Sequence, residues 1–288
     1  MKINFKIIFT LLIIVGIGSC ILKQQEHIKT ITSFNEVDFK KISSDTLVIF
    51  DVDETLIQPE DVYLINENSQ EAKKFKTKVL AQHPEIKDWN ALFSIILLEA
   101  KRPLLEPYIV DNIQELKNRN IPVIALTAMN TGPLGTIPML EDWRYNQLKS
   151  VGFEGSFENL IFPVSIAQGH PAFYKGILAA DLQPKGPVLG AFLDYMKWKP
   201  KNIIMFDDSK QYLLTVLEEC KKRGITFQGY QYKRAYTKAW DENLVQFQAN
   251  YLIEHKKWLN DEQAKILMDK GTQKYAVHSA FIKIEASS

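Results

Sequence analysis

The stretch VIFDVDETLI, residues 48–57, joins an apolar run to three carboxylates. The residues TLVIF (46–50) are rich in β-branched and aromatic side chains, and a run of this length is typical of a buried strand. Asp51, Asp53 and Glu54 follow it directly. Bringing carboxylates near an apolar interior is costly unless something compensates their charge. We therefore expect a compensating partner for these acids at the end of the strand.

The composition is that of an ordinary globular protein. Of the 288 residues, 46% are hydrophobic and 24% are charged, so the chain can bury a full core without disulfides or a structural metal. The formal net charge is +1 at pH 7, which gives no global attraction to nucleic acid. We therefore expect no nucleic-acid partner.

The first twenty residues have the pattern of an export signal. Lys2 and Lys6 precede the apolar run IIFTLLIIVGIG (7–18), which as a helix of about a dozen residues is too short to cross a ~30 Å hydrocarbon core. The tetrapeptide that ends at Cys20 resembles the lipobox of bacterial lipoproteins. This resemblance implies that Cys20 is lipidated, becomes the mature N-terminus and anchors an exported protein to a bacterial membrane. Plain secretion into the periplasm with cleavage near Cys20, or a retained anchor, is the alternative.

Short apolar runs alternate with amphipathic segments through most of the remaining chain. This alternation predicts an α/β fold with a mainly parallel sheet and right-handed crossovers. The expected strands are 46–50, 121–128, 159–165, 202–209 and 225–232, and the expected helices between them are 107–120, 141–152, 185–198 and 210–224.

Two regions depart from this alternation. Residues 62–103 contain two amphipathic helices and no strand, which predicts a small helical cap inserted after the first strand. Residues 236–288 form a helical extension rich in aromatic side chains, which we expect to pack on the core, with a partner interface as the alternative. The expected division is a leader 1–20, a linker 21–44, a core of 45–61 and 104–235, the cap 62–103 and the extension 236–288.

Polar side chains gather where the expected strands end. Asp51 and Asp53 follow the first strand, Thr127 closes the second, and Asp207 and Asp208 close the fourth. The carboxyl ends of parallel strands meet at one edge of a sheet, and ligands of open α/β sheets bind at that edge. We therefore expect these residues to form one site.

Carboxylates gathered at one edge repel one another, by about 4 kcal/mol per pair at 4 Å for an effective dielectric near 20. A divalent cation with oxygen ligands removes this repulsion, and Mg²⁺ prefers such ligands. The predicted ligands are the side chains of Asp51 and Asp207 and the backbone carbonyl of Asp53. Asp208 is expected to orient a lysine or metal-bound water, although Asp207 and Asp208 could exchange roles.

Four short motifs together resemble the haloacid dehalogenase (HAD) superfamily. DVDET (51–55) matches its DxDxT signature, LTA (126–128) carries its Thr/Ser, a lysine precedes a helix, and FDDS (206–209) resembles its acidic fourth motif. The resemblance implies a Rossmann-like HAD core and phosphoryl transfer through an aspartyl-phosphate. It makes Asp51 the nucleophile and Asp53 the general acid and base. In the superfamily that these motifs resemble, phosphatases and phosphotransferases have an acid at the place of Asp53, whereas dehalogenases and P-type ATPases lack one.

The same resemblance implies roles for a threonine and a lysine. Thr127 would hydrogen-bond the transferring phosphoryl group, whereas taken alone it would be a turn or helix cap. Lys185 begins a helix, where a cation is unfavourable unless an anion lies nearby, and it is the preferred phosphate-stabilising lysine. Lys175, in the possible hairpin FYKGIL (173–178), is the alternative.

Two further residues are weaker candidates. His170 lies in QGHPAF (168–173) and is expected to be a turn residue. Arg144 could reach a substrate anion, but a surface ion pair is the expected role.

The expected function is that of an exported Mg²⁺-dependent phosphomonoesterase acting on a phosphorylated small molecule or macromolecule. The chain is distantly similar to class B and class C bacterial acid phosphatases, but FDDSKQYL (206–213) lacks the glycine-aspartate-asparagine pattern of class C. Its layout is also similar to an uncharacterised HAD-like family of secreted bacterial proteins. A catalytically silent scaffold with the HAD fold and a phosphotransferase are the alternatives.

Overall fold

The structure is a computed structural model, and it describes residues 27–270. The expected leader and its lipidation residue Cys20 lie outside the described residues. The chain divides into two compact units, which we describe separately. The sheet unit consists of the segment that ends at Leu56 together with Leu105–Thr131 and Glu141–Ala235, and the helical unit consists of Ile57–Leu104, Gly132–Leu140 and the segment that begins at Tyr236.

The sheet unit is built on an eight-stranded sheet with the order β1-β8-β7-β2-β3-β6-β5-β4. In this spatial order, the strands β1, β8, β7, β2, β3 and β6 are parallel to one another. The last two strands, β5 and β4, are added in antiparallel pairs at one end of the sheet. The predicted α/β class with a mainly parallel, Rossmann-like sheet is therefore confirmed. The strands are β1 (Ile28–Ile31), β2 (Thr46–Phe50), β3 (Val123–Thr127), β4 (Ile161–Pro163), β5 (Ala172–Tyr174), β6 (Ile177–Ala179), β7 (Asn202–Asp207) and β8 (Thr226–Tyr232).

The strand order reverses beside β2. From β2 the chain proceeds to β3 and β6 on one side, and it then returns to form β7 and β8 on the other side. All five of these strands are parallel, so their carboxyl ends meet at one edge. The gap between crossovers that leave in opposite directions is where open α/β sheets bind ligands. The point of reversal lies between β2 and β7.

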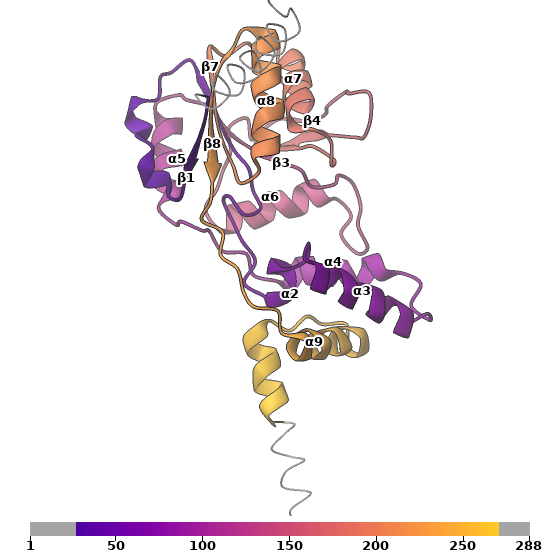
Figure 1. Cartoon of the computed structure of the whole chain (residues 1–288). Coiled ribbons are helices and arrows are strands. Elements are labelled where there is room, and N and C mark those ends of the chain that lie inside the picture. Colours follow the sequence, from indigo (N-terminus) through magenta and orange to yellow (C-terminus); the bar gives the residue numbers. More distant parts are fainter. Residues whose placement is uncertain (1–26, 271–288) are drawn as a thin grey trace, which may run out of the picture. The chain divides into compact units, whose positions relative to one another are not determined.

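Helices cover both faces of this sheet. Helices α7 (Lys185–Tyr195) and α8 (Lys210–Arg223) lie on one face, and α5 (Ile109–Asn118) lies on the other (Figure 1). A Cβ atom at Gly186 would lie 2.1 Å from the carbonyl oxygen of Thr215, so only glycine permits this approach of α7 to α8. The close packing fixes the first turn of α7. Helix α6 (Leu140–Ser150) follows β3.

The third parallel strand differs from the expected one. Residues 159–165 contribute only β4, which is an antiparallel edge strand, whereas the parallel neighbour of β3 is β6. Strands β5 and β6 form the hairpin that FYKGIL suggested, and its turn holds Lys175 at φ 49° and Gly176 at φ 91°. The apolar character of 159–165 predicted a buried strand but not its direction.

The segment before β2 is not the irregular linker that its composition suggested. Strand β1 extends the sheet beside β8, and short 3-10 helices follow at Phe34–Glu36 and Phe39–Lys41. The side chains of Phe34 and Phe39 are buried, and Phe34 stacks on Tyr232 with ring centroids 4.3 Å apart. Isolated aromatic residues in 3-10 turns produce neither a helical nor a strand period, so the sequence pattern did not reveal this packing.

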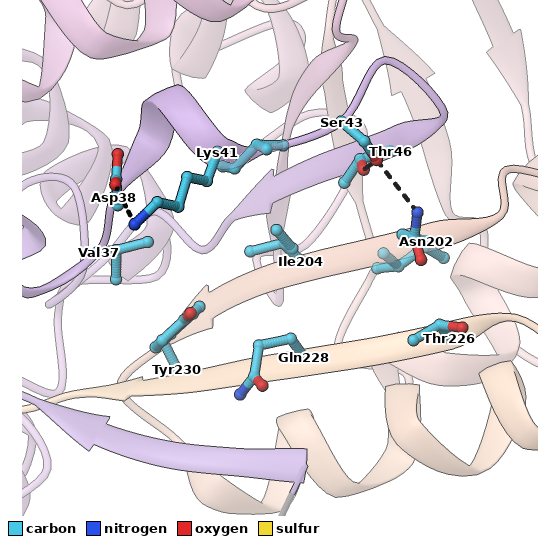
Figure 2. A pocket seen from close by; sticks show the side chains of 12 residues that line it. Val37, Asp38, Lys41, Ser43, Thr46, Asn202, Ile204, Thr226, Gln228 and Tyr230 are labelled. Atoms are coloured by element: carbon cyan, nitrogen blue, oxygen red, sulfur yellow. Dashed lines mark hydrogen bonds and ion pairs between the residues drawn. The ribbon is translucent and has the colours of Figure 1, made fainter.

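Part of the same sheet face remains open as a groove of about 410 Å³ (Figure 2). It lies at the amino ends of β7 and β8, beside the second 3-10 helix. Its lining combines apolar side chains with the polar residues Thr46, Asn202, Thr226 and Gln228 and the ion-paired Asp38 and Lys41. This groove is therefore at the sheet edge opposite to the predicted site.

The helical unit combines the inserted helices with the C-terminal segment. It contains α2 (Val62–Ile65), α3 (Gln70–Gln82), α4 (Trp89–Glu99), α9 (Glu242–His255) and a further helix at 261–270. Val62, Phe75 and Val79 share one hydrophobic cluster with residues of α9. The C-terminal extension therefore packs on the inserted helices, which corrects the expectation that it packs on the core.

Two buried carboxylates join these segments. Asp61 accepts hydrogen bonds from the indole nitrogen of Trp258 at 2.9 Å and from the backbone N–H of Asp261 at 3.0 Å. Asp261 in turn accepts from the backbone N–H of Val62 at 3.1 Å. Asp61 thus accepts from the first backbone N–H group of the helix at 261–270, and Asp261 accepts from the first backbone N–H group of α2. These two contacts tie the starts of the two helices together.

Candidate active site

A buried lysine lies between two buried aspartates in the sheet unit. The Nζ atom of Lys185 is 2.5 Å from Oδ1 of Asp51 and 2.7 Å from Oδ2 of Asp207. Lys185 and Asp207 are fully buried, and 6% of Asp51 is exposed. The ring of Tyr212 covers the ammonium group, with its centroid 4.7 Å from Nζ. Lys185 thus supplies compensating charge beside Asp51, at a place where we expected a metal ion.

The local fold explains how these three side chains meet. Strands β2 and β7 are parallel neighbours with Phe50 opposite Phe206, so Asp51 and Asp207 emerge side by side. The backbone N–H of Asp51 donates to the carbonyl oxygen of Phe206 at 2.8 Å, which extends the pairing one step beyond the strand. Lys185 is the first residue of α7, whose packing on α8 is fixed by Gly186. Rigid elements therefore position all three groups.

Burial and mutual interaction shift the pKa values of this cluster. Burial is the largest cause of the raised pKa of Asp207, about 7, and the charge of Asp51 raises it further while Lys185 lowers it. Burial also raises the pKa of Asp51, against the lowering effect of Lys185. Burial alone would lower the pKa of Lys185, but the two carboxylates raise it above its ordinary value. Lys185 therefore remains charged.

A third carboxylate adjoins this pair. Oxygen atoms of Asp51, Asp207 and Asp208 all lie within 4.8 Å of one another. Burial raises the pKa of Asp208 to about 6, and the charge of Asp51 adds to the effect. When all three carboxylates are ionised, the one ammonium group among these four groups leaves two negative charges uncompensated. This excess charge, carried by hard oxygen donors, fits a divalent cation such as Mg²⁺.

Asp207, the last residue of β7, and Asp208, which follows it, make different contacts. Asp208 was expected to orient the lysine or metal-bound water, with an exchange of roles as the alternative, and Lys185 contacts Asp207. The other oxygen of Asp207 accepts from the backbone N–H of Ser209 at 2.8 Å. The backbone N–H of Asp208 donates to the hydroxyl of Thr55 at 3.1 Å, and this buried threonine was not among the predicted site residues. Thr55 is the last residue of the DVDET motif, and this position in the motif could have indicated that it belongs to the site.

Asp53 has a different environment from the metal-ligand candidates. Its side chain is 46% exposed, and its Oδ2 lies 2.9 Å from Nη2 of Arg144 on α6. Among the described residues, the carboxylate group of Asp53 is not a member of the Asp51–Asp207–Asp208 cluster. Asp53 therefore remains a candidate metal ligand through its backbone carbonyl and not through its side chain. Arg144 is 4% exposed, which corrects the expectation of a surface ion pair.

Thr127 occupies the corresponding position on the neighbouring strand. It is the last residue of β3, which pairs with β2 on the side away from β7. The residue is buried, and its hydroxyl accepts a hydrogen bond from the backbone N–H of Met129 at 3.3 Å. This contact is a turn cap, and the hydroxyl proton can still be donated to a ligand.

The family described as "Protein of unknown function (DUF2608)" matches residues 24–265. The chain belongs to this family. An uncharacterised protein of Rickettsia bellii is 26% identical over 66% of this DUF2608 chain and 69% of its own length. An uncharacterised protein of Rickettsia conorii is 32% identical, and the match spans 48% of the chain and half of that protein's length. A Chlamydia trachomatis protein called "Putative outer membrane protein" is 24% identical over 74% of the chain and 79% of its own length.

Solved structures align with this DUF2608 member at low TM-scores. A Porphyromonas gingivalis protein described as a "predicted HAD-like family hydrolase" gives a TM-score of 0.35 at 13% identity, over 71% of this chain and 98% of that one. A structure of a phospho-aspartyl intermediate analogue of phosphoserine phosphatase gives a TM-score of 0.35 at 14% identity, over 65% of this chain and 93% of that one. At these scores neither likeness bears on the activity. No helix within residues 27–270 is long and apolar enough to span a membrane.

In the described part of the chain, the other two candidate site residues of this DUF2608 member, Lys175 and His170, do not contact the acidic cluster. The Nζ atom of Lys175 is 4.8 Å from the ring centroid of Tyr145 and 5.1 Å from that of Tyr174, which is a cation–π arrangement. The backbone N–H of His170 donates to Asp181 at 2.7 Å in an exposed loop, as a turn residue does. Lys185, and not Lys175, is thus the lysine that the fold brings to the acids.

Proposed function

We propose that this chain is a Mg²⁺-dependent phosphomonoesterase of the HAD type that forms an aspartyl-phosphate on Asp51. The observation that carries the proposal is the buried Asp51–Lys185–Asp207 cluster with Asp208 beside it, at the point where the strand order reverses. An anionic nucleophile is repelled by a phosphate dianion, so attack requires positive charge at the site. Lys185 supplies part of this charge. The four HAD-like motifs of the sequence give independent support.

In the first step a carboxylate oxygen of Asp51 forms a bond to phosphorus while the bond between phosphorus and the ester oxygen breaks. The electron pair of the broken bond stays on the ester oxygen. That oxygen takes a proton from the carboxyl group of Asp53 and departs as an alcohol. The hydroxyl of Thr127 donates a hydrogen bond to the transferring phosphoryl group. Lys185 offsets part of the negative charge of Asp51 and Asp207 throughout.

In the second step water attacks the phosphorus atom of the aspartyl-phosphate. The carboxylate of Asp53 accepts a proton from this water as the new bond forms. The bond between phosphorus and the Asp51 oxygen breaks, its electron pair returns to the carboxylate, and inorganic phosphate leaves. One phosphate ester and one water thus become one alcohol and one phosphate, and both aspartates recover their starting states.

Asp51, Asp207 and Asp208 would hold Mg²⁺, with the backbone carbonyl of Asp53 as a further candidate ligand. When bound, the ion would neutralise phosphoryl oxygens and the two uncompensated charges of the cluster. The fit rests on the three clustered carboxylates. Metal-bound water would complete the coordination that Mg²⁺ requires.

The cellular setting is part of the same proposal. We place the protein outside the cytoplasm, held to a bacterial membrane by a lipid on Cys20, or free in the periplasm after cleavage. The basic and apolar leader supports export, and so does the name of the chlamydial relative. The substrate would be a phosphorylated small molecule or macromolecule.

Metal removal tests this function. We expect EDTA to lower the rate of p-nitrophenyl phosphate hydrolysis by about 100-fold or more and Mg²⁺ to restore it, because metal-ion catalysis is worth several kcal/mol. Asp208→Asn removes one anionic ligand and should raise the half-saturating Mg²⁺ concentration by about 10-fold or more. Hydrolysis at the full rate in EDTA, or an unchanged Mg²⁺ requirement in the variant, would refute the metal assignment.

A further inference from the structure

We propose that Arg144 is a positioning residue that holds the carboxylate of Asp53 in the orientation needed for proton transfer. The inference rests on the proposed function, since it concerns the general acid of that reaction. The distribution of burial in this ion pair points to it. Arg144 is 4% exposed, whereas the Asp53 side chain that it contacts at 2.9 Å is 46% exposed. The fixed member of the pair is thus the cation.

Several contacts fix the guanidinium group independently of Asp53. Its Nη1 atom donates to Oε1 of Gln147 at 2.6 Å, and its Nε lies 3.5 Å from the sulfur of Met129. The ring of Trp143 lies beneath it, with the centroid 4.8 Å from Cζ. Because these partners come from α6 and from the turn after β3, the planar fork is held by two elements of the sheet unit. Its remaining Nη2 group contacts Asp53.

Asp53 has a constrained backbone but an open side chain. The turn that follows it contains Glu54 at φ 62° and the buried Thr55, which accepts a hydrogen bond from Asp208. A half-exposed carboxylate on such a turn would populate several rotamers without a partner. Arg144 engages Oδ2, and we therefore assign the transferred proton to Oδ1 of Asp53. One hydrogen bond thus selects both the rotamer and the reactive oxygen.

Stability alone gives little reason for this arrangement. Burying a guanidinium group is costly, and a partner that is itself half exposed to water returns only part of that cost. Orientation of a reacting group is a different benefit, because small misplacements of a catalytic group lower rates strongly. The burial of Arg144 beside an exposed acid is therefore explained by its effect on Asp53.

A positioning role makes a specific kinetic prediction. Proton donation by Asp53 matters for a strongly basic leaving group, such as the alkoxide of glycerol 3-phosphate, and matters little for p-nitrophenolate. In the full chain, Arg144→Met should lower kcat for glycerol 3-phosphate at least about 10-fold more than kcat for p-nitrophenyl phosphate. KM should change little for either substrate. Arg144→Lys keeps the charge without the fork and should recover only part of kcat.

Three comparisons complete the kinetic test. Asp53→Asn should show the same dependence on the leaving group, and Arg144→Met should add almost nothing to it in the double variant. Arg223→Met is the matched control, since Arg223 pairs with Asp194 at the far end of α8, and it should leave both rates unchanged. Equal losses on both substrates with a raised KM would instead make Arg144 a substrate-binding residue and overturn the proposal.

Crystal structures of the wild-type chain and of Arg144→Met provide a readout that does not need activity. We expect one Asp53 rotamer in the wild type and a different or multiple rotamers in the variant. An unchanged Asp53 rotamer without Arg144 would overturn the positioning role, whether or not the protein hydrolyses phosphate esters. If no ester is hydrolysed but Asp53 moves, the proposed function fails, although Arg144 is still shown to orient the Asp53 side chain. Arg144→Lys serves the same comparison if the methionine variant does not fold.

Discussion

Asp51→Asn is expected to abolish hydrolysis of p-nitrophenyl phosphate, with a loss in kcat on the order of 10⁴-fold or more. An amide cannot form the acyl phosphate on which both steps of the reaction depend. The side chain keeps nearly the same volume and can still accept a hydrogen bond from Lys185, which reaches Asp51 at 2.5 Å. The loss should therefore reflect chemistry rather than unfolding, and steady-state kinetics in Mg²⁺ measure it.

Asp45→Asn is the matched control for this substitution. Asp45 precedes β2 at its amino end, whereas Asp51 follows the same strand at its carboxyl end. Its carboxylate is exposed and pairs with Lys201 at 2.5 Å. This variant should retain the wild-type rate. Equal rates for the wild type and Asp51→Asn would show that Asp51 is not the nucleophile.

Lys185→Met is expected to destabilise the metal-free protein by about 3–5 kcal/mol, because it leaves buried carboxylates without their cation. Asp51 and Asp207 would then face each other with no compensating charge between them. Mg²⁺ should raise the melting temperature of this variant more than that of the wild type, since the ion replaces part of the missing charge. Urea unfolding and thermal melting with and without Mg²⁺ measure both effects.

The pH dependence of this loss follows from Asp207. Its pKa in the folded protein is raised to about 7 from 3.8, so between these values the folded protein keeps a proton that the unfolded chain releases. The contribution of Asp207 to stability therefore falls as pH rises through this window. Without Lys185 the fall should be steeper, so the variant should lose more stability at pH 8 than at pH 5. A loss that does not depend on pH would contradict the buried-charge explanation.

Lys201→Met provides the control for charge removal. Lys201 is exposed and pairs with the exposed Asp45, and such surface pairs contribute little to stability. The free energy of unfolding should stay nearly unchanged in this variant. A loss as large as that of Lys185→Met would mean that burial is not the cause of the predicted effect.

The sequence predicted the site best where the sheet itself determines the positions. Asp51 and Asp207 each follow an apolar strand, and parallel neighbours bring such positions together whatever the loops do. Lys185 could be preferred over Lys175 because a cation at a helix start requires a nearby anion. The contact between Lys185 and Asp207, rather than Asp208, depends on the packing of α7 on α8, which sequence periodicity does not specify.

Contacts that depend on tertiary packing were predicted less well. The segment EDWRYNQLKS (141–150) is mostly polar, so nothing in it indicated that Arg144 is buried beside Asp53. The N-terminal residues 28–42 lack a clear period, although Phe34 is fully buried. The buried Asp61–Asp261 arrangement joins residues two hundred positions apart, and no local pattern predicts such a pair. In each case the partner lies on another element.

A crystal structure with Mg²⁺ and beryllofluoride would test most directly whether Asp51 accepts the phosphoryl group beside a magnesium site. We expect beryllium to bond to the Asp51 carboxylate as a mimic of the aspartyl-phosphate, with Mg²⁺ bound by Asp51 and by Asp207 or Asp208. Beryllofluoride bound away from Asp51, or an ion that Asp207 and Asp208 do not hold, would contradict the proposed catalytic centre.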